Sequence, residues 1–254
     1  MPLKVGIVGL PNVGKSTLFN ALLKRSVAPT AAYPFTTIKP HIGVVEVPDE
    51  NLKKLCEMIK PEKCVPATVN FVDIAGLVKN AHKGEGLGNE FLGYIRDSDA
   101  MVHVIREFED VEVPHVEGSV DPQRDREIIN LELEIAGIKK PTIEWVNRDK
   151  KEFENVDRLI KDAFKLLGLI TFYTIKGGKE VRAWSIKRGA TALQAAEAVH
   201  TDFAKNFVKA EVVDVKELLE LGGWKQARER GKIRLEGRDY EVQDKDVLEI
   251  KAAV

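Results

Sequence analysis

The sequence of 254 residues predicts an α/β fold, in which a domain with a mostly parallel sheet is followed by a smaller β-rich domain. Two observations predict this organisation. Near the N-terminus, an apolar run at residues 5–8 leads through a glycine-bounded turn into a helix-like run at residues 18–23, as in parallel sheets. Near the C-terminus, short strand candidates alternate around one helix-like segment.

The first turn, residues 9–16, reads Gly-Leu-Pro-Asn-Val-Gly-Lys-Ser and has the GxxxxGK[ST] pattern of a phosphate-binding loop. Its glycines allow backbone N–H groups to surround phosphate at a helix N-terminus, where the helix dipole favours negative charge. A chance Gly/Lys turn is the alternative, and both flanking segments argue against it. We expect Lys15 to reach the β- and γ-phosphates and act in catalysis, Ser16 to ligate Mg²⁺, and Asn12, Val13, Gly14 and Thr17 to complete the nucleotide site.

A second motif, Asp73-Ile74-Ala75-Gly76, follows the β-rich stretch 65–72. In a DxxG motif the aspartate holds Mg²⁺ through water and the glycine N–H senses the γ-phosphate, so Asp73 is a predicted metal residue and Gly76 a catalytic one. Between the two motifs, Thr37 is preferred over Thr36 as a metal and catalytic residue. The alternatives are an ordinary turn and an exposed loop threonine.

The segment after Gly76 predicts a loop that is ordered by ligand, because residues 84–88 contain three glycines. Leu77 stands where Ras-like enzymes carry a water-orienting glutamine, so another group must organise attack on the γ-phosphate. His82 is a candidate catalytic residue, against the alternative that it is an exposed and inert loop histidine.

Composition gives no global reason to expect DNA or membrane binding, because 39 basic residues are balanced by 40 acidic ones. The chain contains only two cysteines, Cys56 and Cys64, and nothing in it resembles a signal peptide or a membrane span. So few cysteines predict a protein of a reduced compartment that has no disulfide framework. We therefore expect a cytoplasmic protein, and a monomer.

Long motifs give the chain a family resemblance. They are GLPNVGKSTLFNAL, YPFTTIKPHIGVVEVPD, FVDIAGLVKNAHKGEGLGNEFL, EVRAWSIKRGAT, VHTDF and RLEGRDYEVQDKDV. Together they resemble the YchF, or Obg-like ATPase, family. The resemblance implies a P-loop G domain of the translation-factor class, here residues 1–168, and a TGS domain with a ubiquitin-like β-grasp fold at 169–254. It also implies binding to the ribosome (large subunit) or rRNA, and a preference for ATP over GTP.

Two departures from the family pattern limit this resemblance. A helix that begins near Asp121 ends at Gly137, where family members insert a helical hairpin. The base-reading motif, NxxE in the family, reads Asn147-Arg148-Asp149-Lys150 and so ends in lysine. Guanine selectivity depends on an acid that accepts two N–H groups, so it is not expected here. Adenine selectivity does not follow from this change, because backbone groups or Asn147 must still contact the base. Only one helix, 156–167, precedes the second domain, which predicts a shortened sheet edge.

The C-terminal block predicts strands at 170–175, 181–186, 208–215, 239–242 and 247–251, with a helix at 191–199. Residues 171–190 and 225–238 are locally basic and could contact rRNA, with Trp184 as a stacking or packing group. A solvated strand face with a core tryptophan is the alternative. His103 and the pair formed by His200 and Asp202 are assigned structural roles, because no nucleophile accompanies them.

Two functional hypotheses from different classes follow. In the first, the protein is a switch that binds Mg²⁺ and nucleoside triphosphate, hydrolyses ATP (or GTP) slowly, and changes its affinity for the ribosome on hydrolysis. In the second, it binds nucleotide without hydrolysing it, and its C-terminal domain acts as an adaptor for RNA or ribosomal protein. Phosphate release by the wild type and by Lys15→Ala separates the two.

Overall fold

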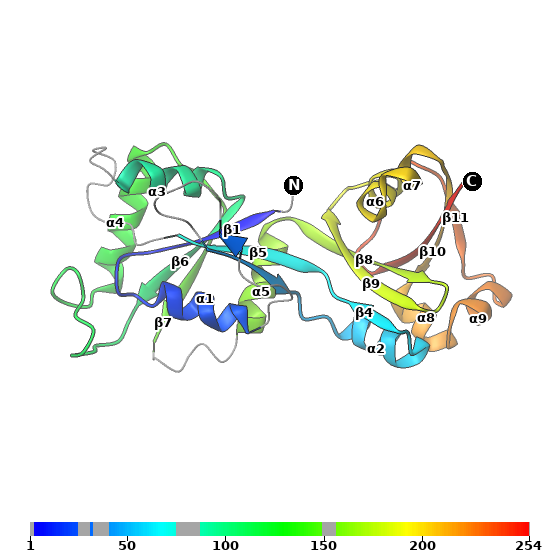
Figure 1. Cartoon of the computed structure of the whole chain (residues 1–254), viewed down its shortest axis with the longest axis horizontal. Helices are drawn as coiled ribbons and strands as arrows, with labels where there is room; N and C mark the ends of the chain where they lie inside the picture. The colour runs from blue at the N-terminus through cyan, green and yellow to red at the C-terminus, as the bar shows by residue number, and fades with distance from the viewer. Residues whose placement is uncertain (1–2, 25–30, 33–40, 75–86, 149–155, 254) are drawn as a thin grey trace. The chain divides into compact units, whose positions relative to one another are not determined.

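The computed structural model describes residues 3–24, 31–32, 41–74, 87–148 and 156–253. The chain divides into two compact units (Figure 1): Met1–Glu46 with Thr68–Leu167, and Val47–Ala67 with Gly168–Val254. Residues 47–67, which the sequence analysis placed within 1–168, thus cluster with the C-terminal part of the chain.

The first unit contains a six-stranded sheet of order β2-β3-β5-β1-β6-β7. Strand β1 is parallel to both β5 and β6, β6 is parallel to β7, and β3 and β2 add antiparallel pairs at one edge. The predicted α/β fold with a mostly parallel sheet is therefore confirmed. The strands are β1 (Lys4–Val8), β2 (Ala31–Ala32), β3 (His41–Glu46), β5 (Thr68–Asp73), β6 (Ala100–Arg106) and β7 (Thr142–Asn147).

Four helices accompany this sheet within the described part of the unit, and the sequence explains where one of them begins and ends. In α4, the Asp121 side chain accepts N–H groups from Gln123 and Arg124, Pro122 occupies the first turn, and Gly137 follows with φ 66°. The expected helix from near Asp121 to Gly137 is thus present. The helices are α1 (Lys15–Leu23), α3 (Leu87–Arg96), α4 (Pro122–Ile135) and α5 (Val156–Leu166).

The second unit contains a mixed sheet of order β11-β10-β12-β8-β9-β4. The β8–β9 hairpin is antiparallel, and β12 pairs in parallel with β8 at the centre, an arrangement that matches the expected β-grasp. Helix α6 (Ala192–Val199) begins at a capping box of Thr191 and Gln194. The strands are β4 (Lys63–Val65), β8 (Leu169–Lys176), β9 (Glu180–Lys187), β10 (Phe207–Asp214), β11 (Arg234–Glu236) and β12 (Asp246–Ala252).

Three details of this unit differ from the sequence prediction. The predicted strand 239–242 is wrong: these residues make only an isolated bridge between Glu241 and Thr191, and β11 lies earlier in the chain. The β-rich stretch 65–72 is split between the two sheets, because Pro66 separates β4 from β5. Four helices were not predicted: α2 (Glu50–Ile59), α7 (Thr201–Lys205), α8 (Val215–Leu221) and α9 (Trp224–Glu229).

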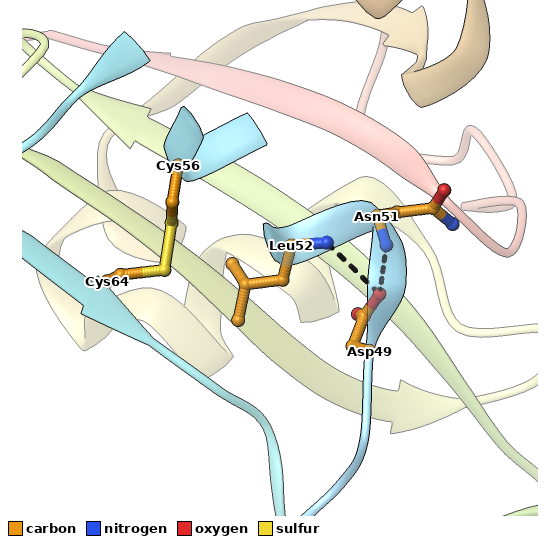
Figure 2. Close-up of a disulfide and its surroundings, with 5 residues drawn as sticks. All are labelled: Asp49, Asn51, Leu52, Cys56 and Cys64. Atoms are coloured by element: carbon orange, nitrogen blue, oxygen red, sulfur yellow. Dashed lines mark hydrogen bonds between the residues drawn. A yellow bond between two sulfur atoms is a disulfide. The ribbon is translucent and has the colours of Figure 1, made fainter. Parts of the chain in front are cut away.

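Cys56 and Cys64 form a disulfide, which corrects the expectation of two reduced thiols (Figure 2). Cys56 lies on α2 and Cys64 on β4, with their Cα atoms 6.2 Å apart. Asp49 caps the N-terminus of α2, because its carboxylate accepts the N–H groups of Asn51 and Leu52 (Figure 2). The helix ends at Lys60, whose φ of 52° reverses the chain towards β4. Cysteine count could not reveal this pairing, because it depends on that reversal.

Within the residues that the structure describes, no helix combines the length and apolar composition needed to span a bilayer.

Candidate nucleotide site

The phosphate loop connects β1 to α1 and has a backbone that only particular residues can adopt. Gly9 has φ 154°, and a Cβ there would lie 2.5 Å from the Val104 carbonyl oxygen. Asn12 and Gly14 are also left-handed, with φ 64° and 102°. Gly14 caps α1 without any side-chain hydrogen bond. The first N–H groups of a helix lack intrahelical acceptors, so this helix start can receive an anion.

Lys15 is almost completely buried, with 7% of its surface exposed. Its Nζ donates to the Leu10 carbonyl oxygen at 2.7 Å, inside the loop. Burial lowers the pKa of Lys15 to about 8, and the charge of Asp73 partly opposes this. Among the described residues, the Leu10 carbonyl is the only hydrogen-bond acceptor of the Lys15 ammonium. A buried ammonium without a charged hydrogen-bond partner is stabilised by a nearby anion.

Two side chains from neighbouring strand ends hold the carbonyl groups of the loop. Arg106 Nη1, at the end of β6, donates to the Asn12 carbonyl oxygen at 3.1 Å. Asn147 Nδ2, at the end of β7, donates to the Val13 carbonyl oxygen at 3.1 Å. Asn147 thus reaches the loop from the predicted base-reading motif.

Ser16 and Asp73 supply two oxygens at the start of α1 and the end of β5. The Ser16 hydroxyl donates to Asp73 Oδ2 at 3.2 Å, while Asp73 Oδ1 is buried without a hydrogen-bond partner among the described residues. Burial raises the pKa of Asp73, against the opposing effects of the Ser16 hydrogen bond and the charges of Lys15 and His41. Mg²⁺ prefers few protein oxygens together with water and phosphate, so this pair fits that ion. The described residues contain no cluster of three or more potential ligands among His, Cys, Asp and Glu.

A cavity of about 420 Å³ extends from the phosphate loop to the ends of β6 and β7. It brings together six of the predicted nucleotide residues, whereas Val13, whose side chain is buried, is not among the lining residues. Thr37, Gly76 and His82 lie outside the described residues, as does Lys150. The cavity is lined by Asn12, Gly14, Lys15, Ser16, Thr17, Asn147, Arg106, Phe108, Asp110 and Val113.

Four of the lining residues, which come from the end of β6 and the segment after it, were not predicted from the sequence. A signal for Arg106 was present, because it ends the otherwise mostly apolar run 100–105. Ligands of parallel α/β sheets bind at the carboxyl ends of strands, so a charged residue at such an end is a candidate ligand-binding residue.

The remaining singled-out residues lie in structural positions. His103 is 2% exposed within β6, and burial lowers its pKa to about 4. His200 caps the short helix α7 through its side chain. Trp184 packs on Phe172, donates to Thr174 Oγ1 at 2.9 Å and lies under Arg182, which favours packing over nucleic-acid stacking.

Comparison with known proteins extends these observations. A family model described as "50S ribosome-binding GTPase" matches residues 4–148, and the YchF-GTPase_C model, described as a protein of unknown function, matches residues 169–253. The "Ribosome-binding ATPase YchF" of Bacillus subtilis is 36% identical over 365 aligned positions, which cover 99% of each chain. This chain belongs to the YchF family. The YchF protein of Haemophilus influenzae is also 36% identical, over 362 positions.

A solved structure, the YchF GTPase of Schizosaccharomyces pombe, shares the fold over nearly the whole chain. Its TM-score is 0.80 at 30% identity, covering 98% of this chain and 97% of that one. The alignment with the Bacillus subtilis YchF spans 365 positions, whereas this chain has 254 residues. That relative therefore carries more than a hundred residues without a counterpart here, as expected if the helical hairpin is missing.

Proposed function

We propose that this YchF-family protein is a slow Mg²⁺-dependent nucleoside triphosphatase that prefers ATP to GTP and binds ribosomes through its second unit. One observation carries the enzymatic part: the loop carbonyls of Asn12 and Val13 bond to protein side chains, while the helix start at Gly14 has no side-chain cap. Such a loop is organised to direct its N–H groups to an anion.

Each predicted residue has a role in this proposal. Lys15 and the backbone N–H groups would bind the phosphates, and Asn147 would contact the base. Ser16 and Thr37 would hold Mg²⁺, with Asp73 acting through water. Bound Mg²⁺ would neutralise charge on the β- and γ-phosphates. Gly76 would sense the γ-phosphate, and His82 is the candidate that orients water.

The proposed preference for ATP over GTP is based on the sequence of the base-reading motif, residues 147–150. Lys150 replaces the acid that would accept the two N–H groups of guanine. The relatives named as ribosome-binding ATPases support the same choice. Competition between ATP and GTP for the wild-type protein tests it, and a large preference for GTP would contradict it.

Ribosome binding is proposed from the names of the relatives and from one basic surface. At the turn of the β8–β9 hairpin, Lys176 and Lys179 are exposed. In 225–238, by contrast, basic side chains already lie beside carboxylates, as in Arg228 with Glu211 and Lys232 with Glu217. The hairpin is therefore the better surface for phosphate of rRNA. A ribosome-bound protein would be cytoplasmic, and intracellular proteins with disulfides are known.

Two measurements test this function. Steady-state phosphate release should fall by about 100-fold or more in Lys15→Ala, whereas Lys24→Ala, a change at the exposed end of α1, should release phosphate like the wild type. In co-sedimentation, the variant Lys176→Glu/Lys179→Glu should bind ribosomes more weakly than the wild type. Its affinity should also fall less steeply as the salt concentration rises. Equal sedimentation by this variant and the wild type would remove the hairpin from the proposal.

A nucleotide-binding adaptor without hydrolysis is the second candidate. It is favoured by the sheet, whose described strands end at β7, and by Lys150 at the base motif. Equal phosphate release by the wild type and Lys15→Ala, together with nucleotide binding by the wild type, would select this alternative.

A further inference from the structure

Arg106 is a fully buried arginine at the end of the strand next to the phosphate loop. It is 1% exposed, and it lies directly opposite Asn147 in the register between β6 and β7. Arginine is rarely so buried without a charged partner, because removing the guanidinium from water is costly. Its position therefore requires an explanation beyond packing.

The hydrogen bonds of Arg106 join two parts of the site. Nη1 donates to the carbonyl oxygens of Asn12, at 3.1 Å, and Val113, at 2.8 Å. Nε donates to the carbonyl oxygen of Phe108 at 2.8 Å. Asn12 adds a second link, because its Nδ2 donates to the Pro114 carbonyl oxygen at 3.1 Å. The phosphate loop is thus tied to the segment that follows β6.

These bonds also fix the direction of loop N–H groups. In a trans peptide the C=O of one residue and the N–H of the next point in opposite directions. When Arg106 holds the Asn12 carbonyl, it sets the orientation of the Val13 N–H. When Asn147 holds the Val13 carbonyl, it sets that of the Gly14 N–H.

The charge of Arg106 is not neutralised by these partners. Its three hydrogen-bond acceptors among the described residues are all neutral backbone carbonyls, and its guanidinium carbon lies 4.7 Å from the centre of the Phe108 ring. Nη2 is buried and has no hydrogen-bond partner among the described residues, and the side chain lines the cavity. A buried positive charge that borders a cavity favours an anionic occupant.

We infer that Arg106 is a positioning residue for a polyphosphate ligand: it braces the phosphate loop through Asn12 and adds a buried positive charge to the cavity. This deepens the proposed function and rests on it for the identity of the ligand. The predicted ligand class is the polyphosphate tail itself, so the effect of Arg106 does not require a nucleoside.

Calorimetric titration with Mg²⁺ and inorganic tripolyphosphate, and separately with Mg²⁺ and ATP, tests this inference. Arg106→Met removes both the hydrogen bonds to the loop and the charge, so it should lower the affinity for both ligands by about ten-fold or more. Arg106→Lys keeps the charge but not the forked geometry, so it should lower the affinity for both ligands by a smaller factor. The control is Arg126→Met on α4, where Arg126 pairs with Glu144 away from the cavity, and it should stay within about two-fold of the wild type.

A second readout needs no ligand. NMR order parameters of residues 12–14 in the ligand-free protein should fall in both Arg106 variants and stay unchanged in Arg126→Met. The inference would be overturned if Arg106→Met bound tripolyphosphate as tightly as the wild type, or if only its affinity for ATP fell. If the wild type binds neither ligand, the proposed function fails, and unchanged order parameters would then overturn the bracing by Arg106 as well.

Discussion

Buried polar groups of the two units are satisfied in different ways. At the site in the first unit, three buried atoms lack a hydrogen-bond partner among the described residues: Asp73 Oδ1, Arg106 Nη2 and Asn147 Oδ1. In the second unit, buried Asp246 accepts from the Tyr240 hydroxyl at 2.7 Å and from the Gln243 N–H at 2.9 Å. The only such unpartnered atom in the described second unit is Trp224 Nε1.

This difference separates a unit organised around a ligand from a unit whose polar groups stabilise its own fold. Unpaired buried polar atoms are costly, and they are commonly retained where a ligand or ion completes them. Ligand should therefore stabilise the first unit. Changes in the second unit should alter its stability without altering phosphate binding.

The largest expected effect comes from Gly9→Ala in the phosphate loop. A Cβ would meet the Val104 carbonyl oxygen at 2.5 Å, and φ is 154°, so we expect a loss of about 3 kcal/mol or more. Hydrogen-exchange mass spectrometry should show this loss in the first unit only. Gly93→Ala is the control, because a Cβ there has nothing within 4 Å. Equal protection of Gly9→Ala and the wild type would contradict the close approach.

His103 should make the first unit sensitive to acid. Burial lowers its folded pKa to about 4, with Glu144 raising it and Arg126 and Lys15 lowering it. The unfolded chain therefore takes up a proton first as the pH falls below about 6.5, and stability is lost between about 6.5 and 4. Denaturant unfolding at pH 7.5 and 5 should show about 2 kcal/mol more loss in the wild type than in His103→Gln. The same loss in both proteins would contradict the lowered pKa.

The disulfide should stabilise the second unit alone. Cys56→Ser/Cys64→Ser removes a short covalent loop, and we expect a loss of about 2–3 kcal/mol in free energy of unfolding. A reductant should destabilise the wild type similarly and leave the double variant unchanged. Alkylation followed by mass spectrometry reports whether the thiols are paired. Free thiols in the untreated wild type would contradict the disulfide.

The smallest effect is expected from Tyr240→Phe. The Tyr240 hydroxyl donates to Asp246 and accepts from Arg234 Nη2 at 2.9 Å, so its loss should cost about 1–2 kcal/mol. Thermal unfolding measures this cost, and tripolyphosphate affinity should remain that of the wild type. A change in affinity would break the separation between the two units.

Local signals in the sequence predicted much of the fold. The turn at residues 9–16 and the α4 boundaries depend on glycine, proline and capping side chains that act within a few residues. Local strand and helix patterns likewise predicted the β8–β9 hairpin and the helix at 191–199. The predicted strand 239–242 was wrong because the Tyr240 carbonyl accepts from the Ala192 N–H and the Val242 N–H donates to the Ala190 carbonyl, so these groups do not pair with a sheet strand.

Long-range contacts could not be predicted in the same way. Arg106 donates a hydrogen bond to Asn12, which lies 94 positions away in the sequence, and Asn147 donates one to Val13, which lies 134 positions away. No pattern within either segment specifies these partners. The pairing of Cys56 with Cys64 and the clustering of 47–67 with the second unit also depend on how segments return to each other in space.

Calorimetric titration of Mg²⁺ and ATP into the wild type and Lys15→Ala tests the central claim most directly. The account predicts binding of one nucleotide per wild-type chain and a loss of affinity of about 100-fold in Lys15→Ala, because a buried charged contact to phosphate is removed. Absence of binding by the wild type, or equal affinity in the two proteins, would contradict it.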